Sequence, residues 1–358
     1  MHISADDQRL RWRGAVSLEA SGDSVTPWRL PHQDSDLYLP VGGIGCATMP
    51  SGVRIGFRTD AAEFDCHYMT FPPLYDSVPP EFPRVDARID GALYQTVELE
   101  RRTDDGAFRV GQLPAGDKLV ELWLPIYSQF RFRGLDLPSG SCVARDDSGV
   151  PGWTHYGCSV SQGRGAASPS ENWLAQVARR GGLDLTSLSM AGTCHLQPMF
   201  ARLTRDLPAT LISVHAGTNI YYYGSLSRDT LQAAVIGFVQ IVREKHPVTP
   251  LVMISPTFGP NYERRPGPTK LTHKLIREEM KSACEWMTDR GDENLHYVNG
   301  LDLLGPDDEP LLLEPPDAQM RIHFSSAAHD LVARRLLSIL QGCGAVTVPE
   351  SPGAFSRC

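Results

Sequence analysis

Short runs in which hydrophobic and polar residues alternate occupy the chain from about residue 25 to about residue 145. Because successive side chains of a strand point to opposite faces, each run predicts a strand with one buried face. Turn residues such as Asp90 and Gly91 separate the runs, as in hairpins. The runs are residues 36–39, 53–58, 63–68, 84–89, 95–99 and 118–124. No clear helical period lies between them, so the pattern predicts a β-sandwich or jelly roll.

The hydrophobic period changes after residues 143–152, a polar segment that contains Gly and Pro. Strands are predicted at residues 183–189, 210–214, 251–255 and 295–298. The run at 251–255 is almost continuously apolar, as expected for a strand buried on both faces. Apolar residues recur at helical spacing within residues 169–181, 199–203, 231–242, 275–287 and 328–339. Strands that alternate with helices form a parallel sheet covered on both faces. The prediction is a β-sandwich domain at 1–148, a three-layer α/β domain at 149–345 and a C-terminal tail at 346–358.

Serines stand where several of these helices are predicted to begin. Ser168 starts the sequence Ser-Pro-Ser-Glu, which is typical of a capping box with proline in the first helical turn. Ser227 is predicted to cap the helix at 231–242, and the last predicted helix follows Ser325.

The composition excludes several classes of protein. Of the 358 residues, 41% are hydrophobic and 21% are charged, which rules out a disordered, collagen-like or coiled-coil chain. The formal net charge of −8 argues against a nucleic-acid partner, because a phosphate backbone needs a basic face. No run of about 18 apolar residues occurs, so no membrane partner is expected.

The eight cysteines are scattered, without a CxxC pair or a spacing typical of a metal site. The N-terminus lacks the pattern of a signal peptide. Together these features indicate reduced thiols in a cytoplasmic protein. Neither a metal ion nor a cofactor is expected.

Four polar loops carry the candidate chemistry, because ligands bind beyond the carboxyl ends of parallel strands. They contain Ser159, Gly192, Asn219 and His323. Acyl transfer to serine needs a hydroxyl, a base for its proton, and donors aimed at the developing oxyanion. Ser159 would supply the hydroxyl and His323 the base. The N–H of Gly192 and the side-chain amide of Asn219 would supply the donors.

The order of these loops resembles that of the SGNH (GDSL-type) hydrolases. Residues 157–163, Gly-Cys-Ser-Val-Ser-Gln-Gly, are similar to the first conserved block of that superfamily, and Gly192 to the glycine of its second block. Residues 217–219, Gly-Thr-Asn, are similar to its third block, and His323 to the histidine before its last helix. The resemblance covers about residues 150–342.

Three further segments are similar to a two-domain esterase subgroup with an N-terminal β-rich domain of the GxDLY type. They are residues 34–38, 122–127 and 294–300, although the first of these begins with Asp where the element has Gly. The resemblance implies that Ser159 is the nucleophile and that His323 is the base and then the acid. It also implies an oxyanion hole made by the Ser159 N–H, the Gly192 N–H and the Asn219 side chain.

One position departs from the superfamily. Its usual aspartate three residues before the histidine is Met320 here. Asp317 and Glu314 lie just upstream, and either could orient His323 if the loop bends back. Otherwise a backbone carbonyl would orient the imidazole in a Ser–His dyad. The predicted catalytic set is Ser159, His323 and Asp317.

Two further segments could contact a substrate. Residues 221–223, three tyrosines, follow Asn219 closely and either line a substrate pocket or are ordinary half-buried aromatic residues. The loop at 258–270 contains Arg264 and Arg265, and it either selects an anionic substrate or is a solvated connection.

The predicted function is a serine esterase that cleaves a small acyl ester through an acyl-serine intermediate. The expected partner is a small-molecule ester such as an acylated sugar or natural product. One alternative is an acyltransferase or cyclase of a biosynthetic pathway, in which an amine or a hydroxyl replaces water. The other is a carbohydrate-binding module fused to a degenerate hydrolase.

Overall fold

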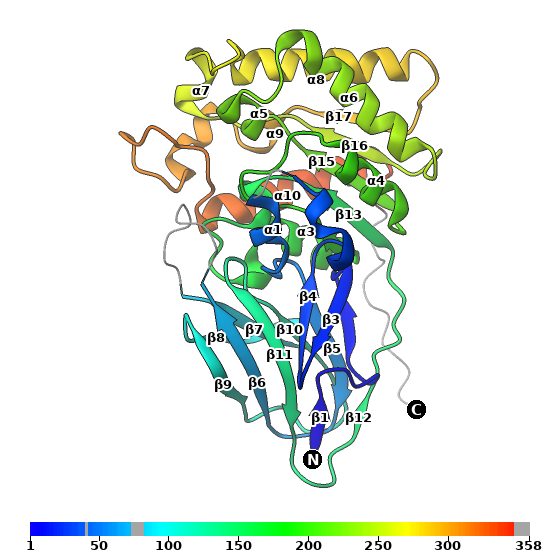
Figure 1. Cartoon of the computed structure of the whole chain (residues 1–358), viewed down its shortest axis with the longest axis vertical. Helices are drawn as coiled ribbons and strands as arrows, with labels where there is room; N and C mark the ends of the chain where they lie inside the picture. The colour runs from blue at the N-terminus through cyan, green and yellow to red at the C-terminus, as the bar shows by residue number, and fades with distance from the viewer. Residues whose placement is uncertain (40–41, 73–81, 347–358) are drawn as a thin grey trace.

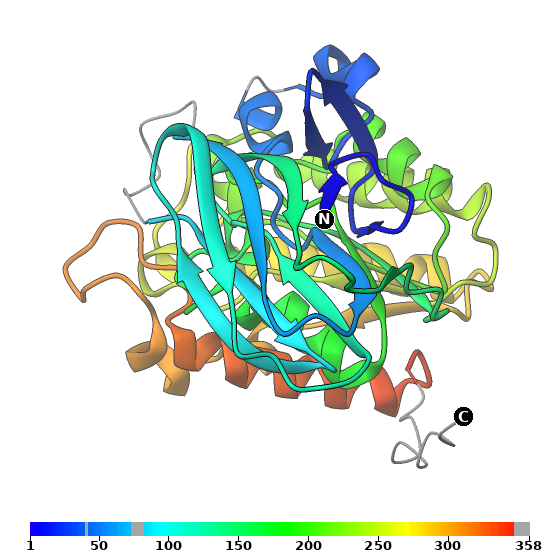
Figure 2. The same cartoon turned by 90° about the horizontal axis from the view of Figure 1, so that it is seen from below.

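The computed structural model describes residues 1–39, 42–72 and 82–346 (Figure 1). A β-sandwich is built from the front of the chain and an α/β domain from the rest, so the predicted fold class is confirmed. Figure 2, viewed from below, shows the strands of the sandwich in front of the α/β domain. The predicted tail at 346–358 lies outside the described residues except for Val346. Within the described ranges, no helix has both the length and the hydropathy of a membrane span.

The sandwich consists of two antiparallel six-stranded sheets. The strands are β1 (His2–Ser4), β2 (Arg11–Arg13), β3 (Ser17–Ser21), β4 (Ser24–Trp28), β5 (Arg54–Thr59), β6 (Phe64–Phe71), β7 (Arg84–Ile89), β8 (Ala92–Glu98), β9 (Thr103–Val110), β10 (Lys118–Trp123), β11 (Gln129–Asp136) and β12 (Val143–Ala144). One sheet has the order β3-β4-β11-β6-β9, with β1 beside β11. The other has the order β12-β5-β10-β7-β8, with β2 beside β5.

Alternation along the sequence produces the core between these sheets. In β6, Phe64, Cys66 and Tyr68 are buried, whereas the residues between them are partly exposed. The predicted runs at 53–58, 63–68, 84–89, 95–99 and 118–124 correspond to β5, β6, β7, β8 and β10.

The strand predicted at residues 36–39 is wrong. The 3-10 helix η1 (His32–Leu37) covers the first half of this segment, and the helix α1 (Gly42–Ala47) follows it. Leu37 and Leu39 are 59% and 58% exposed, and Tyr38 between them is buried. Tyr38 packs edge-on against Phe200 of the α/β domain, at 5.4 Å between ring centroids. The single buried side chain therefore serves a contact between the domains and not a sheet face.

The α/β domain contains a parallel sheet of five strands in the order β14-β13-β15-β16-β17. The strands are β13 (Gly152–Tyr156), β14 (Asp184–Ser187), β15 (Leu211–His215), β16 (Leu251–Ile254) and β17 (Leu295–Val298). Every residue of β16 is buried, as its apolar run predicts, and every residue of β15 is buried as well.

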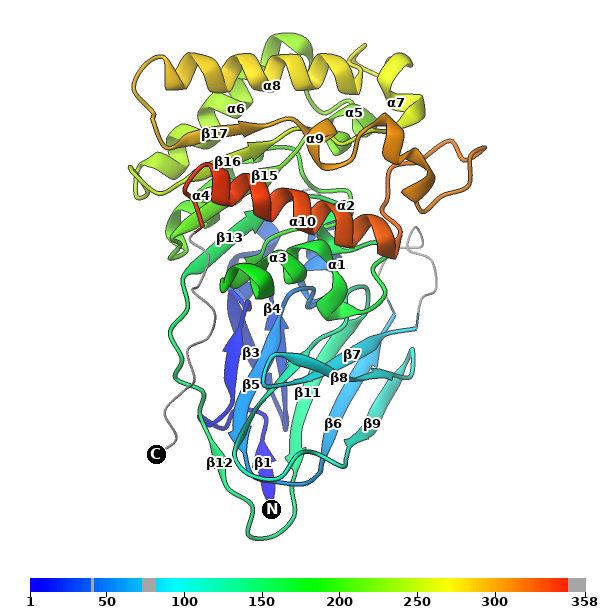
Figure 3. The same ribbon diagram turned by 180° about the vertical axis from the view of Figure 1, so that it is seen from behind.

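Helices cover both faces of this sheet. The longer ones are α3 (Trp173–Gly181), α4 (Pro198–Asp206), α6 (Arg228–Arg243), α8 (His273–Thr288) and α10 (Ser326–Gly342). Figures 1 and 3 show α3 and α10 on the face turned toward the sandwich, and α4, α6 and α8 on the opposite face. The shorter helices are α2 (Ser159–Gln162), η2 (Pro169–Glu171), α5 (Thr218–Tyr223), α7 (Pro260–Arg264), α9 (Gly300–Leu303) and η3 (Pro306–Leu311).

Two of the three serines stand where the sequence predicts. Ser227 forms a capping box at the start of α6, and the Ser325 side chain accepts from the N–H of Ala328 in α10. The capping box predicted at Ser168 is absent, because its hydroxyl donates to Asp86 of β7 at 2.6 Å. The α3 helix begins instead at Trp173, capped by the Asn172 side chain.

Buried ion pairs join the sandwich to the parallel sheet. The carboxylate of Asp184, at the start of β14, accepts from Arg13 of β2 at 2.8 Å and from Arg54 of β5 at 2.5 Å. Both arginines are buried. A buried cation is stable only while it is paired, so Asp184 holds the two domains together electrostatically.

We expect Asp184→Asn to lower the free energy of unfolding by about 2 kcal/mol, because two buried guanidinium groups lose the carboxylate that they share and keep only one other each. Arg13 still pairs with Asp146, and Arg54 with Glu121. Urea unfolding followed by circular dichroism measures this loss. Asp117→Asn is the matched control, because Asp117 pairs with Arg58 on the surface and should matter by under about 1 kcal/mol. Equal losses in the two variants would contradict the proposed role of the interface.

Candidate active site

The loop after β13 presents Ser159 to a cleft. The chain turns so sharply there that a Cβ at Gly157 would lie 2.5 Å from the Ser161 Oγ atom. Glycine at this position therefore permits the turn. Ser159 is the first residue of α2, and that helix ends at Gly163, whose φ is 111°. The Tyr127 hydroxyl, from the sandwich side, donates to the carbonyl oxygen of Ser159 at 3.1 Å. Both domains therefore fix the backbone of the predicted nucleophile.

His323 stands just before α10 and faces Ser159. Its Nε2 atom lies 2.9 Å from the Oγ atom of Ser159, within hydrogen-bond reach. The imidazole is buried, with 6% of the residue exposed. The structure therefore brings together the two residues that the sequence predicts as nucleophile and base.

Glu314 orients this imidazole. Its Oε1 atom is bonded to Nδ1 of His323, and its Oε2 atom accepts from the backbone N–H groups of Ile322 and His323, each at 3.1 Å. Burial alone would raise the pKa of Glu314, but the imidazole and the two N–H groups lower it below its ordinary value. The carboxylate is therefore charged at neutral pH and favours a proton on Nδ1, which leaves Nε2 free to accept from Ser159.

The prediction that Asp317 orients His323 is not what the structure shows. The dyad, in which a backbone carbonyl would orient the imidazole, is not seen either, because the Glu314 carboxylate is bonded to Nδ1. Asp317 is exposed, and Glu314 takes the ring nitrogen that Asp317 was expected to reach. The reason is the fold of the loop: the Leu313 N–H donates to the His323 carbonyl at 2.8 Å, which brings Glu314 back beside the imidazole. Spacing along the chain does not reveal such a return.

The two predicted oxyanion donors lie on neighbouring loops of the same cleft. Gly192 follows β14 with a φ of +72°, a conformation that favours glycine, and a Cβ there would lie 3.0 Å from the Tyr223 hydroxyl. Asn219 lies in the first turn of α5, where its Oδ1 atom accepts from the Cys194 N–H at 3.0 Å. That bond leaves the NH2 group of the Asn219 amide as the end available to a ligand.

The loop that contains Gly192 is fixed by Gln162 of α2, the helix that begins with Ser159. The Gln162 Oε1 atom accepts from the Ala191 N–H at 2.8 Å, and the Gln162 NH2 group donates to the Ile126 carbonyl at 3.0 Å. The positions of Gln162 and Tyr127 in the sequence predict no such role for them, because their partners lie far away along the chain.

The cleft has a volume of about 920 Å3, which suits a small molecule. Much of its wall is apolar or aromatic, and Leu39 and Tyr127 come from the front of the chain. Tyr222 and Tyr223 line the cleft, which agrees with the interpretation that these tyrosines form a substrate pocket. Arg264 and Arg265 do not line it, so they are not placed to select a substrate there. The lining residues are Leu39, Tyr127, Ser159, Arg164, Ala191, Gly192, His195, Gln197, Thr218, Asn219, Tyr222, Tyr223, Ser225, Glu314, Met320, Ile322 and His323.

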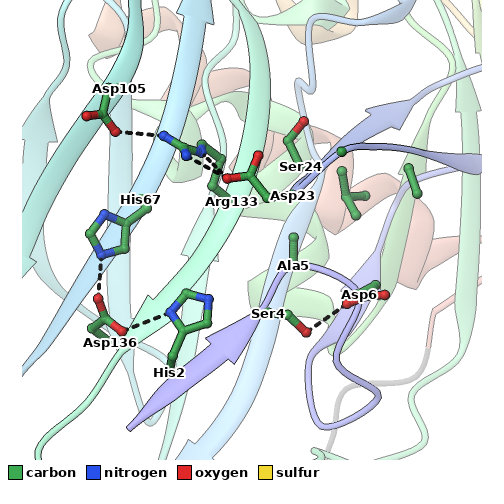
Figure 4. Close-up of a pocket in the computed structure, with 13 residues that line it drawn as sticks. His2, Ser4, Ala5, Asp6, Asp23, Ser24, His67, Asp105, Arg133 and Asp136 are labelled. Carbon is green, nitrogen blue, oxygen red and sulfur yellow. Dashed lines mark hydrogen bonds and ion pairs between the residues drawn. The ribbon is translucent and has the colours of Figure 1, made fainter.

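A smaller hollow of about 380 Å3 lies on the sandwich and contains none of the predicted site residues (Figure 4). Its charged groups are bonded to one another. Arg133 donates to Asp23 and Asp105, and Asp136 lies between His2 and His67. Each of these groups has a hydrogen-bond partner within the hollow, and none of the groups predicted to react lies there.

Comparisons with known proteins agree with this geometry. The family model for the SsfX3 N-terminal domain matches residues 10–133, and the model for the GDSL-like lipase/acylhydrolase family matches residues 154–314. No curated protein matches the chain.

Solved structures extend the likeness over both domains. The salicylyl-acyltransferase SsfX3 from a tetracycline biosynthetic pathway is 41% identical, with a TM-score of 0.92 over 98% of this chain and 99% of that one. A GDSL-like protein from Bacteroides ovatus ATCC 8483 is 17% identical, with a TM-score of 0.78 over 98% of this chain and 99% of that one. A family two carbohydrate esterase from Cellvibrio japonicus shares the fold at 13% identity and a TM-score of 0.61, over 96% and 97% of the two chains. The chain therefore belongs to the GDSL-like (SGNH) lipase/acylhydrolase family, in the two-domain subgroup whose N-terminal domain is of the SsfX3 type.

Proposed function

We propose that the protein cleaves a small acyl ester through an acyl-Ser159 intermediate. The observation that carries this proposal is the 2.9 Å contact between Ser159 Oγ and His323 Nε2, with the Glu314 carboxylate on the other ring nitrogen. A hydroxyl, a base and an orienting carboxylate in series are what an activated serine needs.

In the first step, the Ser159 oxygen attacks the ester carbonyl while its proton passes to His323 Nε2. Negative charge then develops on the carbonyl oxygen. The N–H groups of Ser159 and Gly192 and the Asn219 amide stabilise this charge, and one such donor contributes about 10²–10³ in kcat in a related chemistry. Glu314 stabilises the imidazolium that forms at the same moment.

In the second step, the C–O bond to the leaving alcohol breaks, and the imidazolium returns its proton to that oxygen. Ser159 now carries the acyl group. A water molecule then gives its proton to His323 and attacks the acyl carbon, which releases the acid and restores the serine.

A second candidate is transfer of the acyl group to a hydroxyl or amine acceptor. The specific support is the 41% identity with the salicylyl-acyltransferase, which extends over both domains. The volume of the cleft, about 920 Å3, also leaves room for a second small molecule beside an acyl group. The chemistry up to acyl-Ser159 is common to both functions.

The carbohydrate-binding alternative has less support. It was suggested by the missing aspartate at position 320 together with the β-sandwich. The sandwich is present, but the Glu314 carboxylate is bonded to His323, so the first of the two grounds is gone. A cytoplasmic location stays a proposal, supported by buried cysteines such as Cys66, Cys158 and Cys284, which form no disulfide.

We predict that Ser159→Ala abolishes labelling by a fluorophosphonate probe and lowers the turnover of p-nitrophenyl acetate by at least about 10³-fold, because the nucleophile is gone. Peptide mapping of the labelled wild-type protein should place the probe on Ser159. Ser326→Ala is the control, since that serine is exposed at the start of α10. Unchanged turnover in Ser159→Ala, with the thermal midpoint retained, would rule out the mechanism.

We predict that Glu314→Gln lowers kcat by about 10²–10⁴-fold, because the amide no longer stabilises the imidazolium. Asp317→Asn is the matched control and should keep the wild-type rate. The lowered pKa of Glu314 determines how the effect depends on pH. The wild-type carboxylate is charged above that pKa and loses its charge only as the pH falls through it. The defect of Glu314→Gln should therefore persist at neutral and alkaline pH, and a wild-type rate there would exclude Glu314.

Ester hydrolysis and acyl transfer can be distinguished by how the acyl group of acyl-Ser159 is divided between water and an added acceptor. If water is the acceptor, free acid accounts for the released p-nitrophenol, even with a high concentration of an alcohol or amine present. If the enzyme is a transferase, a suitable acceptor raises the rate of phenol release and appears as its ester or amide, because it takes the acyl group from Ser159 faster than water. Mass spectrometry of the products measures the ratio.

A further inference from the structure

One charged side chain in the active-site cleft has no partner among the residues that the structure describes. Arg164 and Glu314 both line the cleft. Glu314 is bonded to His323 and to two backbone N–H groups. The Arg164 guanidinium, in contrast, makes no hydrogen bond or ion pair with any residue that the structure describes, and its Nε atom is buried.

Other arginines with a buried, unbonded nitrogen are different. Arg29, Arg179 and Arg243 each have one such atom, but each donates from elsewhere on the guanidinium. In the hollow of Figure 4, Arg133 is held by Asp23 and Asp105. A charged group without an acceptor destabilises the protein to the extent that it is buried, and an anion bound to the guanidinium would offset that cost. In Arg164 only the Nε atom is buried and unbonded, so the other two guanidinium nitrogens are the ones open to such a ligand.

The backbone of Arg164 is fixed beside the reactive groups. Its N–H donates to the Ser159 carbonyl at 3.2 Å, and its own carbonyl accepts from Nε2 of the buried His329 at 2.9 Å. Gly165 packs against the backbone of Phe324, next to His323, so closely that a Cβ would lie 2.1 Å from the Phe324 oxygen. Arg164 is therefore held in the turn between the predicted nucleophile and its base.

We propose that Arg164 binds an anionic group, a carboxylate or a phosphate, on the ester substrate. A guanidinium presents paired donors that match either group, and it keeps its charge at all physiological pH values. Arg164 would thus select negatively charged esters, the role that the sequence suggested for Arg264 and Arg265. The inference rests on the proposed function and adds the chemical class of its substrate.

The test compares matched esters, each rate being divided by the rate of hydroxide-catalysed hydrolysis. Mono-p-nitrophenyl succinate against p-nitrophenyl butyrate places the charge on the acyl part. The pair 4-acetoxybenzoate and 4-acetoxybenzamide places it on the leaving group. We expect the wild-type protein to prefer the anionic member of at least one pair in kcat/KM, and the preference to shrink as salt rises from about 20 mM to about 500 mM. No preference in either pair would overturn the proposal, whatever any variant does.

Substitution of Arg164 tests whether this residue causes the preference for anionic esters. Arg164→Gln should lower the ratio of anionic to neutral kcat/KM by at least about tenfold, and Arg164→Lys should retain part of it. Arg264→Gln is the matched control, because Arg264 is exposed and does not line the cleft. The thermal midpoint checks that each variant folds. An unchanged ratio in Arg164→Gln would refute the role of Arg164.

A binding measurement keeps this result separate from the mechanism. In a Ser159→Ala background, calorimetric titration with the preferred anionic ester should give a Kd at least about tenfold higher when Arg164→Gln is added. Loss of turnover in Ser159→Ala with an unchanged Kd in the double variant would sink only the Arg164 inference. Retained turnover in Ser159→Ala would sink the proposed function itself.

Discussion

The hydrogen bond between Ser159 Oγ and His323 Nε2 joins side chains that are 164 residues apart in the sequence. Most of the α/β domain serves to bring them together, since the residues lie on loops at the two ends of that domain. Glu314 is anchored by the backbone N–H groups of Ile322 and His323 and so fixes the direction of the imidazole. The proposed chemistry depends on this series of contacts, because a base that is turned away from the hydroxyl cannot take its proton.

The sandwich takes part in the same arrangement. The Tyr127 hydroxyl bonds to the Ser159 carbonyl, and the Ile126 carbonyl accepts from Gln162, which in turn holds the loop of Gly192 through Ala191. The buried pairs of Asp184 with Arg13 and Arg54 tie the two domains together elsewhere. The β domain is thus a wall and a support of the cleft, which is consistent with a relative that matches over both domains.

Charge is distributed differently in the two cavities. In the hollow of the sandwich, Arg133 and Asp136 are hydrogen-bonded to neighbouring side chains (Figure 4). In the active-site cleft, the charge of Arg164 is not met by any described residue. Hydrolysis and transfer both proceed through the same acyl-serine, which is then attacked by water or by an acceptor. The proposed contact between Arg164 and an anionic substrate would therefore act equally in an esterase and in a transferase. Substrate charge and acceptor identity are therefore separate questions.

The sequence by itself determined the two halves of the fold, because each hydrophobic period reports which side chains a strand or helix buries. It also determined the caps at Ser227 and Ser325, which depend on local bonds, and the order of the loops that hold Ser159, Gly192, Asn219 and His323. Tertiary contacts decided the rest. Ser168 bonds to Asp86 instead of capping a helix, and residues 36–39 form no strand because Tyr38 packs on Phe200. Glu314 replaces Asp317 beside His323 because the loop folds back on itself, and the energy of such a contact depends on distance in space, which separation along the chain does not encode.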